Sequence, residues 1–426
     1  MEGILYPQFP IRRFIANIAD GPFGSSLTSS HYADGGARVI RLGNVGSARF
    51  KDSDFAYITL EYFKELRRHE VLPGDLIIAG LGDGNNPVGR ACVAPDHLGP
   101  AIVKADCFRV RLDEERLIHR YAAWALSSSF VSDQVSSLTR GSTRARINLE
   151  VVRDIQLPIP SLEEQSRIVN FLDAETARID RLIHLRSQQV NLLTSRHLSR
   201  LSEISSALTE RFGEIYLRYF IARIEQGWSP QCEDRLADAG EWGVVKAGCV
   251  NTGRFDQLQH KALPGNIEPR REYQLRLGDL LMSRASGSPD LIGSVGFVRE
   301  LDSNLLLCDK IYRLSVDRTR AKADFVAHML RSHQSREHIK NGISGAEGMA
   351  NNLPTRVIRE CIVPNVPIGL QDQIAADLDR DIEKTERARA VLERSILLLT
   401  ERREALISAA VTGQLDVTTA RRASVA

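Results

Sequence analysis

Three arginines and two hydroxyl side chains lie in one loop of seven residues, Arg140-Gly141-Ser142-Thr143-Arg144-Ala145-Arg146. An arginine can bind a phosphate oxygen or donate two N–H groups to O6 and N7 of guanine, and serine and threonine hydroxyls suit phosphates or base edges. The pattern therefore predicts a nucleic-acid contact made by Arg140, Ser142, Thr143, Arg144 and Arg146. An ordinary solvated loop is the alternative.

A second polar segment lies at the matching place in the second half of the chain. Gly345 and Asn352 match Gly141 and Asn148 at a spacing of 204 residues (352 − 148). An asparagine amide can pair with N6 and N7 of adenine, so Asn351 and Asn352 are candidate base contacts. Asparagines that shape a turn are the alternative.

Further candidate DNA contacts lie in segments rich in turn-forming residues. They are Ser25, Ser26, Asn44, Arg284 and Ser286. Turns favour serine, asparagine and glycine for conformational reasons alone, so a structural role is the alternative at each of these positions.

The sequence contains no recognisable catalytic or metal-binding motif. No glycine is followed by lysine, which excludes a Gly-Lys-Ser/Thr phosphate loop, and His-Glu-x-x-His and Asn/Asp-Pro-Pro-aromatic motifs are also absent. Three histidines recur at five-residue steps (His328, His333 and His338), which does not place them on one helix face. The six cysteines lie singly, without a Cys-x-x-Cys pair. We therefore predict a chain without catalysis or a cofactor of its own.

Length and composition indicate a soluble protein with more than one domain. A chain of 426 residues is too long for a single core, and 43% hydrophobic and 26% charged residues are ordinary for globular proteins. No signal peptide and no apolar stretch of about 18 residues is visible, so we expect a cytoplasmic protein. The net charge of +2 is no strong electrostatic footprint for nucleic acid.

The elements that must position these loops include a very long predicted helix. Ser161 and Glu164 have the spacing of a capping box at its start. Twelve positions then step by three or four residues without proline or glycine, and nine of them are apolar: Ile168, Leu172, Glu175, Ile179, Ile183, Arg186, Val190, Leu193, His197, Leu201, Ile204 and Leu208. Such a helix is roughly 60 Å long, so its stripe must be buried against another helix.

A second stripe near the end of the chain supplies the partner. Eight of its eleven positions are apolar: Ile374, Leu378, Ile382, Thr385, Arg389, Leu392, Ile396, Leu399, Arg403, Leu406 and Ala410. Five charged or histidine residues interrupt the two stripes, namely Glu175, Arg186, His197, Arg389 and Arg403. They are either solvated positions beside a drifting stripe, or polar residues that fix the helix register or contact a partner protein.

The two halves of the chain are tandem copies of one unit. Leu172-Asp173 recurs as Leu378-Asp379, 206 residues later (378 − 172), and Gly74-Asp75 recurs as Gly278-Asp279, 204 residues later (278 − 74). The frame is kept, whereas the loops differ in almost every residue. An internal repeat of this kind governs the fold, and two copies with different loops imply two related but non-identical recognition tasks.

These observations predict two mixed α/β domains in tandem, joined by two long antiparallel, coiled-coil-like helices with pseudo-twofold symmetry. The predicted boundaries are 1–155 for the first domain, 156–212 for the central helix, 213–360 for the second domain and 361–426 for the C-terminal helix. Within the first domain, residues 117–138 are expected to be helical.

Three segments resemble the specificity subunits of type I restriction–modification systems. Residues 157–169 with Leu172-Asp173 and Ile179-Asp180 are similar to the central conserved region of that family. Residues 402–415 are similar to its C-terminal conserved region, and residues 21–27 resemble a frequent opening of its target-recognition domains. The resemblance covers essentially the whole chain, including its half-repeat architecture.

The resemblance implies a DNA-binding subunit without catalysis. Two target-recognition domains would each bind half of a bipartite site in double-stranded DNA, and the helices would set the spacing and dock two methyltransferase subunits. In a restriction complex, two motor-nuclease subunits would join them. S-adenosylmethionine, ATP and magnesium would belong to these partners, which methylate an adenine that is flipped out of the duplex.

Two alternatives remain open. A scaffold of two protein-binding modules without nucleic acid would suit the modest net charge. An enzyme with unrecognised motifs is the other, and the missing phosphate, metal and methyltransferase motifs argue against it.

Overall fold

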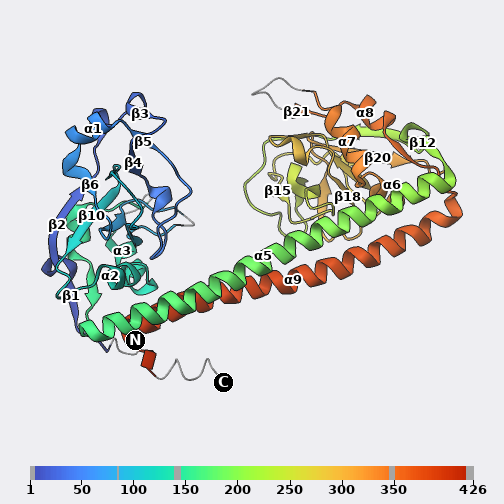
Figure 1. The fold of residues 1–426 in the computed structure, drawn as a ribbon. Coiled ribbons are helices and arrows are strands. Elements are labelled where there is room, and N and C mark those ends of the chain that lie inside the picture. Colours follow the sequence, from blue (N-terminus) through green and yellow to red (C-terminus); the bar gives the residue numbers. More distant parts are fainter. Residues whose placement is uncertain (1–4, 84–85, 139–144, 345–350, 419–426) are drawn as a thin grey trace. The chain divides into compact units, whose positions relative to one another are not determined.

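The computed structural model describes residues 5–83, 86–138, 145–344 and 351–418. The chain divides into two compact units: unit 1 contains residues 1–186 and 394–426, and unit 2 contains residues 187–393. Each unit consists of a mixed α/β domain, called domain 1 or domain 2 below, and part of each of two long helices (Figure 1). Among the described residues, no helix combines the length and the hydropathy that a membrane span requires.

The two long helices are α5 (Leu162–Phe212), with 51 residues, and α9 (Ile368–Thr412), with 45. At 1.5 Å per residue they are about 75 Å and 68 Å long, so α5 is longer than its apolar stripe predicts. The predicted capping box of α5 is confirmed. The backbone N–H of Glu164 donates to Ser161 Oγ over 3.3 Å, and the backbone N–H of Ser161 donates to Glu164 Oε2 over 3.3 Å.

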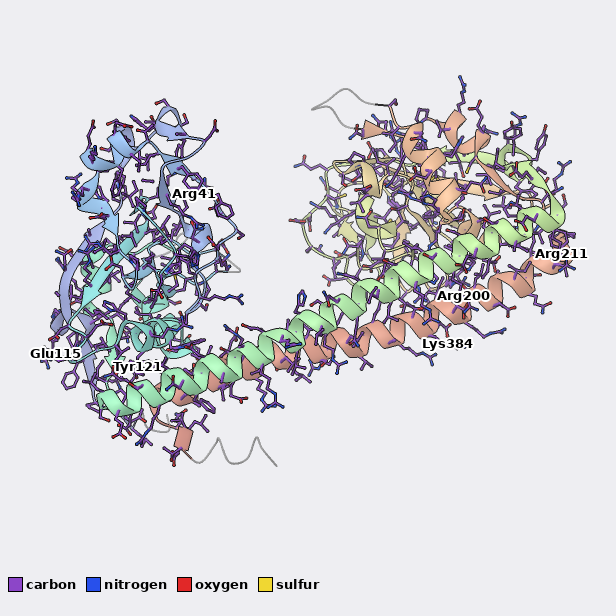
Figure 2. The ribbon with its side chains drawn as sticks, viewed as in Figure 1. Arg41, Glu115, Tyr121, Arg200, Arg211 and Lys384 are labelled. Carbon is purple, nitrogen blue, oxygen red and sulfur yellow. The ribbon has the colours of Figure 1, made fainter. Side chains whose placement is uncertain are left out.

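The helices pack together in an antiparallel manner within each unit. Unit 1 pairs the first part of α5 with the last part of α9, and unit 2 pairs the last part of α5 with the first part of α9. Every position of the two predicted stripes is buried or partly buried. An ion pair links the helices in each unit. Arg403 Nε lies 2.9 Å from Asp180 Oδ1, and Arg200 Nε (Figure 2) lies 2.8 Å from Asp381 Oδ2.

Domain 1 contains three sheets. A four-stranded antiparallel sheet has the order β2 (Ile15–Asp20), β10 (Cys107–Leu112), β7 (Leu76–Ala79) and β8 (Ala91–Val93). A five-stranded sheet has the order β3 (Tyr32–Ala33), β5 (Tyr57–Ile58), β4 (Ala37–Ile40), β9 (Ala101–Val103) and β6 (Glu70–Val71), with β4 and β9 parallel. The third pairs β1 (Gln8–Pro10) with β11 (Gln156–Pro158).

Domain 2 repeats the four-stranded sheet and the two-stranded ladder at the domain ends, and has a smaller second sheet. Its four-stranded sheet has the order β13 (Ile221–Gln226), β20 (Ile311–Val316), β16 (Leu280–Ser283) and β18 (Val295–Phe297). Its second sheet has the order β15 (His260–Ala262), β14 (Trp242–Val245) and β19 (Asn304–Leu306), again with one parallel pair. Two ladders pair β12 (Glu214–Tyr216) with β22 (Ile362–Pro364), and β17 (Ala285–Ser286) with β21 (Asn351–Asn352). The predicted tandem α/β fold is confirmed.

Short helices complete each domain. Domain 1 has α1 (Leu60–Glu65), α2 (His119–Leu126), α3 (Ser129–Leu138) and α4 (Leu149–Asp154), and domain 2 has α6 (Ala323–Met329), α7 (His333–Asn341) and α8 (Thr355–Glu360). The predicted helical segment 117–138 contains two helices, because α2 ends at Leu126 and α3 begins at Ser129. The hydroxyl of Ser128 accepts the N–H of Val131 over 3.4 Å and so caps the start of α3.

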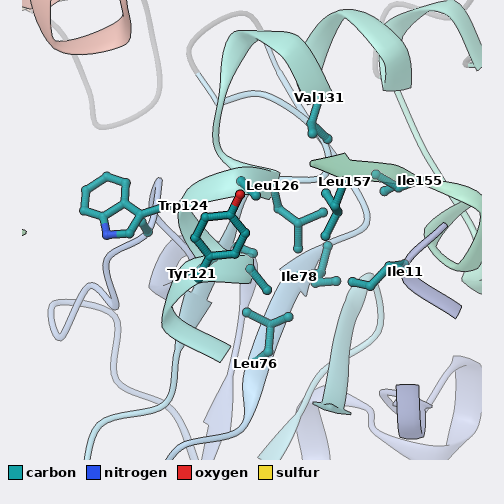
Figure 3. Close-up of a cluster of buried hydrophobic side chains, with 14 of the residues drawn as sticks. Ile11, Leu76, Ile78, Tyr121, Trp124, Leu126, Val131, Ile155 and Leu157 are labelled. Atoms are coloured by element: carbon teal, nitrogen blue, oxygen red, sulfur yellow. The ribbon is translucent and has the colours of Figure 1, made fainter. Parts of the chain in front are cut away.

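Both long helices contribute to the core of each domain. In domain 1, the buried side chains of Ile11, Leu76, Ile78, Leu126 and Leu157 surround Tyr121 (Figure 3). The same cluster contains Leu172 of α5 and Val411 of α9. The core of domain 2 likewise contains Leu201 of α5 and Leu378 of α9.

A buried glutamine fastens each domain to the start of a long helix. Gln165 of α5 accepts the N–H of Ile118 over 2.9 Å and donates to the carbonyls of Pro160 and Arg116 over 3.0 and 3.1 Å. Gln371 of α9 makes the three corresponding bonds to Lys322, Val366 and Arg320 over 2.8, 2.8 and 3.3 Å. Both glutamines are fully buried.

Replacing either glutamine should destabilise its own unit. Gln165→Ala leaves one N–H and two carbonyls without their partner, and each such buried group costs about 1–3 kcal/mol unless water reaches it. We expect the urea midpoint of unit 1 to fall for Gln165→Ala and that of unit 2 for Gln371→Ala. Gln188→Ala, an exposed position on α5, is the matched control and should leave both midpoints unchanged. Equal midpoints in all three variants would contradict this role.

Candidate nucleic-acid interface

The candidate surface is built on one loop in each domain. Loop A (described residues 80–83 and 86–90) follows the buried strand β7, and loop B (284–294) follows the buried strand β16. Each loop pairs with the segment that precedes the last short helix of its domain, which is α4 in domain 1 and α8 in domain 2. The sheet therefore fixes one side of each loop and this pairing fixes the other.

In domain 1, the described part of the predicted basic loop is paired to loop A. Gly82 N–H donates to Ala145 O, and Ile147 N–H donates to Gly80 O, each over 2.9 Å. Arg146 lies between these bonds, is exposed, and has its Nη2 2.7 Å from Asp106 Oδ1. Arg140, Ser142, Thr143 and Arg144 lie outside the described residues, so the predictions for them stay predictions.

In domain 2, the predicted contact residues come together. Ser286 pairs with Asn351 and Ala285 pairs with Asn352 in the β17–β21 ladder. The backbone carbonyl of Arg284 accepts the N–H of Leu353 over 2.9 Å, and its Nη1 donates to Asp309 O over 3.2 Å. Two segments, 284–286 and 351–352, thus place an arginine, a serine and two asparagines at one small ladder.

The ladder corrects the predicted alignment of the two copies. Asn148 caps α4 by accepting the N–H of Val151 over 2.9 Å, whereas Pro354 occupies the cap position of α8. Asn352 pairs with Ala285 as Arg146 pairs with Leu81, so Asn352 is the counterpart of Arg146 at a spacing of 206 (352 − 146). The same place holds a guanidinium in domain 1 and an amide in domain 2.

The predictions in the first domain's turns have different outcomes. Ser25 is exposed and Ser26 is partly buried in a short 3-10 helix, Gly24–Ser26. Asn44 is fully buried. Its amide donates to Lys51 O and Asp54 O over 2.9 Å each and accepts the N–H of Arg41 over 2.9 Å. The prediction of a base contact for Asn44 is therefore wrong for this conformation, because its hydrogen-bonding groups already shape the 41–54 loop.

The polar residues that interrupt the helix stripes are all partly buried. Arg403 pairs across the helices with Asp180, while Arg389 pairs with Glu386 and Glu393 of its own helix over 3.6 and 3.2 Å. Glu175 and Arg186 lie on the same inward stripe of α5. Burial lowers the pKa of His197, which favours its neutral form at pH 7. A register-fixing role suits Arg403, and partner contacts by these five residues stay a prediction.

Sequence reasoning missed a pair of arginines that the repeat retains. Val45-Gly46-Ser47-Ala48-Arg49-Phe50 recurs as Val250-Asn251-Thr252-Gly253-Arg254-Phe255, at a spacing of 205 (254 − 49). The residue before each arginine has a left-handed backbone, with φ of 53° at Ala48 and 77° at Gly253. Both arginines are exposed, and neither has an ion-pair partner within the described ranges. Their identity across the repeat was the available signal.

Each of these arginines borders a polar cleft beside a long helix. Arg49 lines a cleft of about 540 Å³ that Asp173 also borders, and Arg254 lines one of about 290 Å³ that Asp379 borders. The carboxylate of Asp173 accepts from Trp124 Nε1 over 2.9 Å, and Asp379 accepts from His328 Nε2 over 3.0 Å. Burial raises the pKa of Asp379, but His328 and Arg299 outweigh it and lower that pKa below its usual value.

The described residues contain no group of three or more histidine, cysteine, aspartate or glutamate side chains that could hold a metal ion. Loops A and B and the segments paired with them carry hydrogen-bond donors and acceptors: guanidinium, amide, hydroxyl and carboxylate groups. This chemistry suits binding to a polar polymer.

Comparison with known proteins gives concordant results. Residues 18–192 match the family model described as the type I restriction modification DNA specificity domain. The chain is 22% identical over 391 residues to the type I restriction enzyme EcoKI specificity subunit of Escherichia coli (strain K12), covering 88% of this chain and 82% of that protein. It is 24% identical over 326 residues to the StySPI specificity subunit of Salmonella potsdam, covering 73% and 68%.

The fold is also similar to a solved structure. A chain from work on complex assembly and conformational transition of the type I R-M system superposes with a TM-score of 0.66 at 16% identity, covering 97% of this chain and 99% of that one. Together with the tandem α/β domains and the paired helices, these matches support the identification of the chain as similar to the specificity subunits of type I restriction–modification systems.

Proposed function

We propose that this chain is the non-catalytic, DNA-binding subunit of a type I restriction–modification complex, in which each domain binds one half of a bipartite duplex site. The observation that carries the proposal is the pair of matching ladders on loops A and B. Two domains built on the same four-stranded sheet present Arg146 and Asn352 at the same ladder position. One scaffold with different contact groups suits two half-sites of different sequence.

The side chains on loop B and on the segments paired with loops A and B suit base edges. Arg146 and Arg284 can donate to guanine O6 and N7, while Asn351 and Asn352 can pair with adenine N6 and N7. Ser286 offers a hydroxyl group for a DNA contact in domain 2, and Ser25 and Ser26 offer hydroxyl groups in domain 1. In the ion pair between Arg146 and Asp106 the arginine side chain is 58% exposed and the aspartate 24%, so a guanine can reach the guanidinium and replace the carboxylate as its partner.

Residues that contact phosphates can be identical in the two domains, whereas residues that contact bases should differ. The two half-sites differ in their bases but share one sugar–phosphate backbone, so groups that bind phosphate can be the same in both domains. Arg49 and Arg254 meet this condition, because the repeat retains both while the surrounding loops diverge. We propose that each arginine contacts a backbone phosphate.

The long helices are proposed to set the half-site spacing and to dock two methyltransferase subunits. Large apolar side chains with 39–69% exposure lie in the middle of both helices: Leu182, Leu185, Leu192 and Leu198 on α5, and Val391, Leu397 and Leu398 on α9. Exposed apolar groups of this density suit a protein interface. The partners would supply S-adenosylmethionine and the methyl transfer to a flipped adenine, and motor-nuclease subunits would use ATP and magnesium.

The first test is DNA binding by the assembled complex. With its methyltransferase subunits, the protein should bind its bipartite duplex at least ~10³-fold more tightly than scrambled DNA at physiological salt. The affinity should fall as salt rises, because phosphate contacts release counterions. Filter binding at several salt concentrations measures both quantities. A protein-binding scaffold without nucleic acid would instead show equal, weak binding to both duplexes.

The second test addresses the two retained arginines. Arg49→Gln and Arg254→Gln should each make the slope of log K against log salt shallower by about 0.9, with little change in sequence preference. Arg318→Gln is the matched control, since Arg318 is exposed but the first copy has Glu114 at that position (318 − 114 = 204). A slope unchanged in both variants would refute the phosphate contacts.

The third test addresses the helices. Leu185→Lys combined with Leu398→Lys places two charges in the exposed apolar region of unit 1, where little destabilisation is expected. We expect at least ~10-fold weaker binding of the methyltransferase subunit, measured by light scattering after size exclusion. Leu258→Lys, at a 64% exposed leucine of domain 2, is the control and should assemble normally. Normal assembly of the double variant would argue against docking at this surface.

A further inference from the structure

A buried arginine holds loop A in place. Arg90, only 5% exposed, donates from Nη1 to the carbonyls of Leu81 and Pro87 over 3.2 and 2.9 Å. Its Nε donates to Val45 O over 2.7 Å and its Nη2 to Leu42 O over 3.1 Å. Four guanidinium N–H groups are therefore bonded to backbone carbonyls at both ends of loop A and in the neighbouring 42–45 turn.

A different arginine holds loop B. Arg336 extends from α7 and donates from Nη1 to Ile292 O and from Nη2 to Asp290 O, each over 2.8 Å. Lys340, one turn later on α7, has its Nζ 2.9 Å from Asp290 Oδ1. Gly293 lets the loop approach the helix, since a Cβ there would lie 2.5 Å from the side chain of Ile339. Loop B is thus fastened to α7 by its backbone.

The two arginines are not counterparts in the repeat. At the domain spacing of 204, Arg90 corresponds to Ser294 and Arg336 corresponds to Ser132 (294 − 90; 336 − 132). The two domains therefore brace the same loop from different places: Arg90 is the last residue of loop A, directly before β8, whereas Arg336 lies on α7. The bracing of the loop is common to both copies, although the residue that provides it is not.

The hydrogen bonds of Arg90 and Arg336 limit the capacity of these side chains for direct DNA contacts. Within the described ranges, neither guanidinium pairs with a carboxylate, and burial lowers the pKa of both. Charge-assisted bonds to several carbonyls offset the cost of desolvating a guanidinium. Because four of the five N–H groups of Arg90 are engaged, this side chain has little left to offer a base or a phosphate.

We propose that Arg90 and Arg336 are positioning residues for DNA specificity: each fixes the backbone of its own loop, so that the side chains of the loop and of the segment paired with it meet one half-site. The inference rests on the proposed function. It assigns Arg90 to the half-site bound by domain 1 and Arg336 to the half-site bound by domain 2. Loss of either brace should relax discrimination at one half-site only.

The experiment uses the full complex with its methyltransferase subunits and three duplexes. One carries the site mapped from methylation by the wild-type complex, and the other two carry a single changed base pair in one or the other half-site. Arg90→Met and Arg336→Met remove the guanidinium and keep much of the aliphatic stem. Arg90→Lys keeps the charge but not the forked geometry.

We expect reciprocal results from filter binding. Arg90→Met should lose about tenfold in discrimination at the domain 1 half-site, roughly the value of one good base contact, and keep discrimination at the other. Arg336→Met should show the reverse. Arg90→Lys should resemble Arg90→Met, because lysine cannot bridge four carbonyls in fixed geometry. The salt slope should stay that of the wild type in all three, since no phosphate contact is removed.

Three outcomes would overturn the inference. They are equal loss at both half-sites, unchanged discrimination in both Met variants, and loss of affinity with a shallower salt slope, which would indicate a phosphate contact. Arg336 is only partly buried, so Arg336→Met carries the test if Arg90→Met fails to fold. Failure of the proposed function is a separate result, because the wild-type complex would then not distinguish any of the duplexes.

Discussion

Burial of the apolar stripes of α5 and α9 is the constraint on which the rest of the structure depends. Leu172 and Val411 belong to one core, although they come from opposite ends of different helices. Leu201 and Leu378 stand in the same relation to the core of domain 2. Unit 2 is one contiguous stretch, 187–393, whereas unit 1 joins residues 1–186 to residues 394–426. The core of domain 1 can therefore close only after the last part of α9 has been added, which makes the folding of unit 1 depend on a segment that follows unit 2 in the chain.

The duplication lets one copy serve as a comparison for the other. Gln165 and Gln371 are retained with all three hydrogen bonds, because a helix start has N–H and carbonyl groups that need partners in either copy. At the ladder position, by contrast, domain 1 has Arg146 where domain 2 has Asn352. At these positions the glutamines that hold the helix starts are kept, while the ladder residue differs. This is the pattern expected when one scaffold recognises two different surfaces.

Much of the frame could be predicted from the sequence, because helix periodicity and internal repeats are local or linear signals. The stripes, the capping box and the tandem α/β organisation were all visible in this way. The site was harder. Asn44 has the residue type and the turn context that suit a base contact. Its side-chain NH2 group, however, donates hydrogen bonds to carbonyls seven and ten residues later in the chain. A two-residue shift before α8 hid the match of Arg146 with Asn352, since only the ladder fixes that register. Long-range hydrogen bonds leave no periodic trace.

Hydrogen bonds to the backbone carbonyls of a loop allow its side chains to vary while its conformation is kept. A loop that determines sequence specificity must change its side chains freely, but it must also hold them in a defined place. Every residue has the same backbone carbonyl. The hydrogen bonds from Arg90 to the carbonyls of Leu81 and Pro87 therefore do not depend on which side chains those positions carry. A brace made of side-chain pairs would fail whenever one partner changed. Arginine-to-backbone bonds therefore permit variation in loops A and B without loss of their shape, and the two domains have reached that arrangement from different places in the fold.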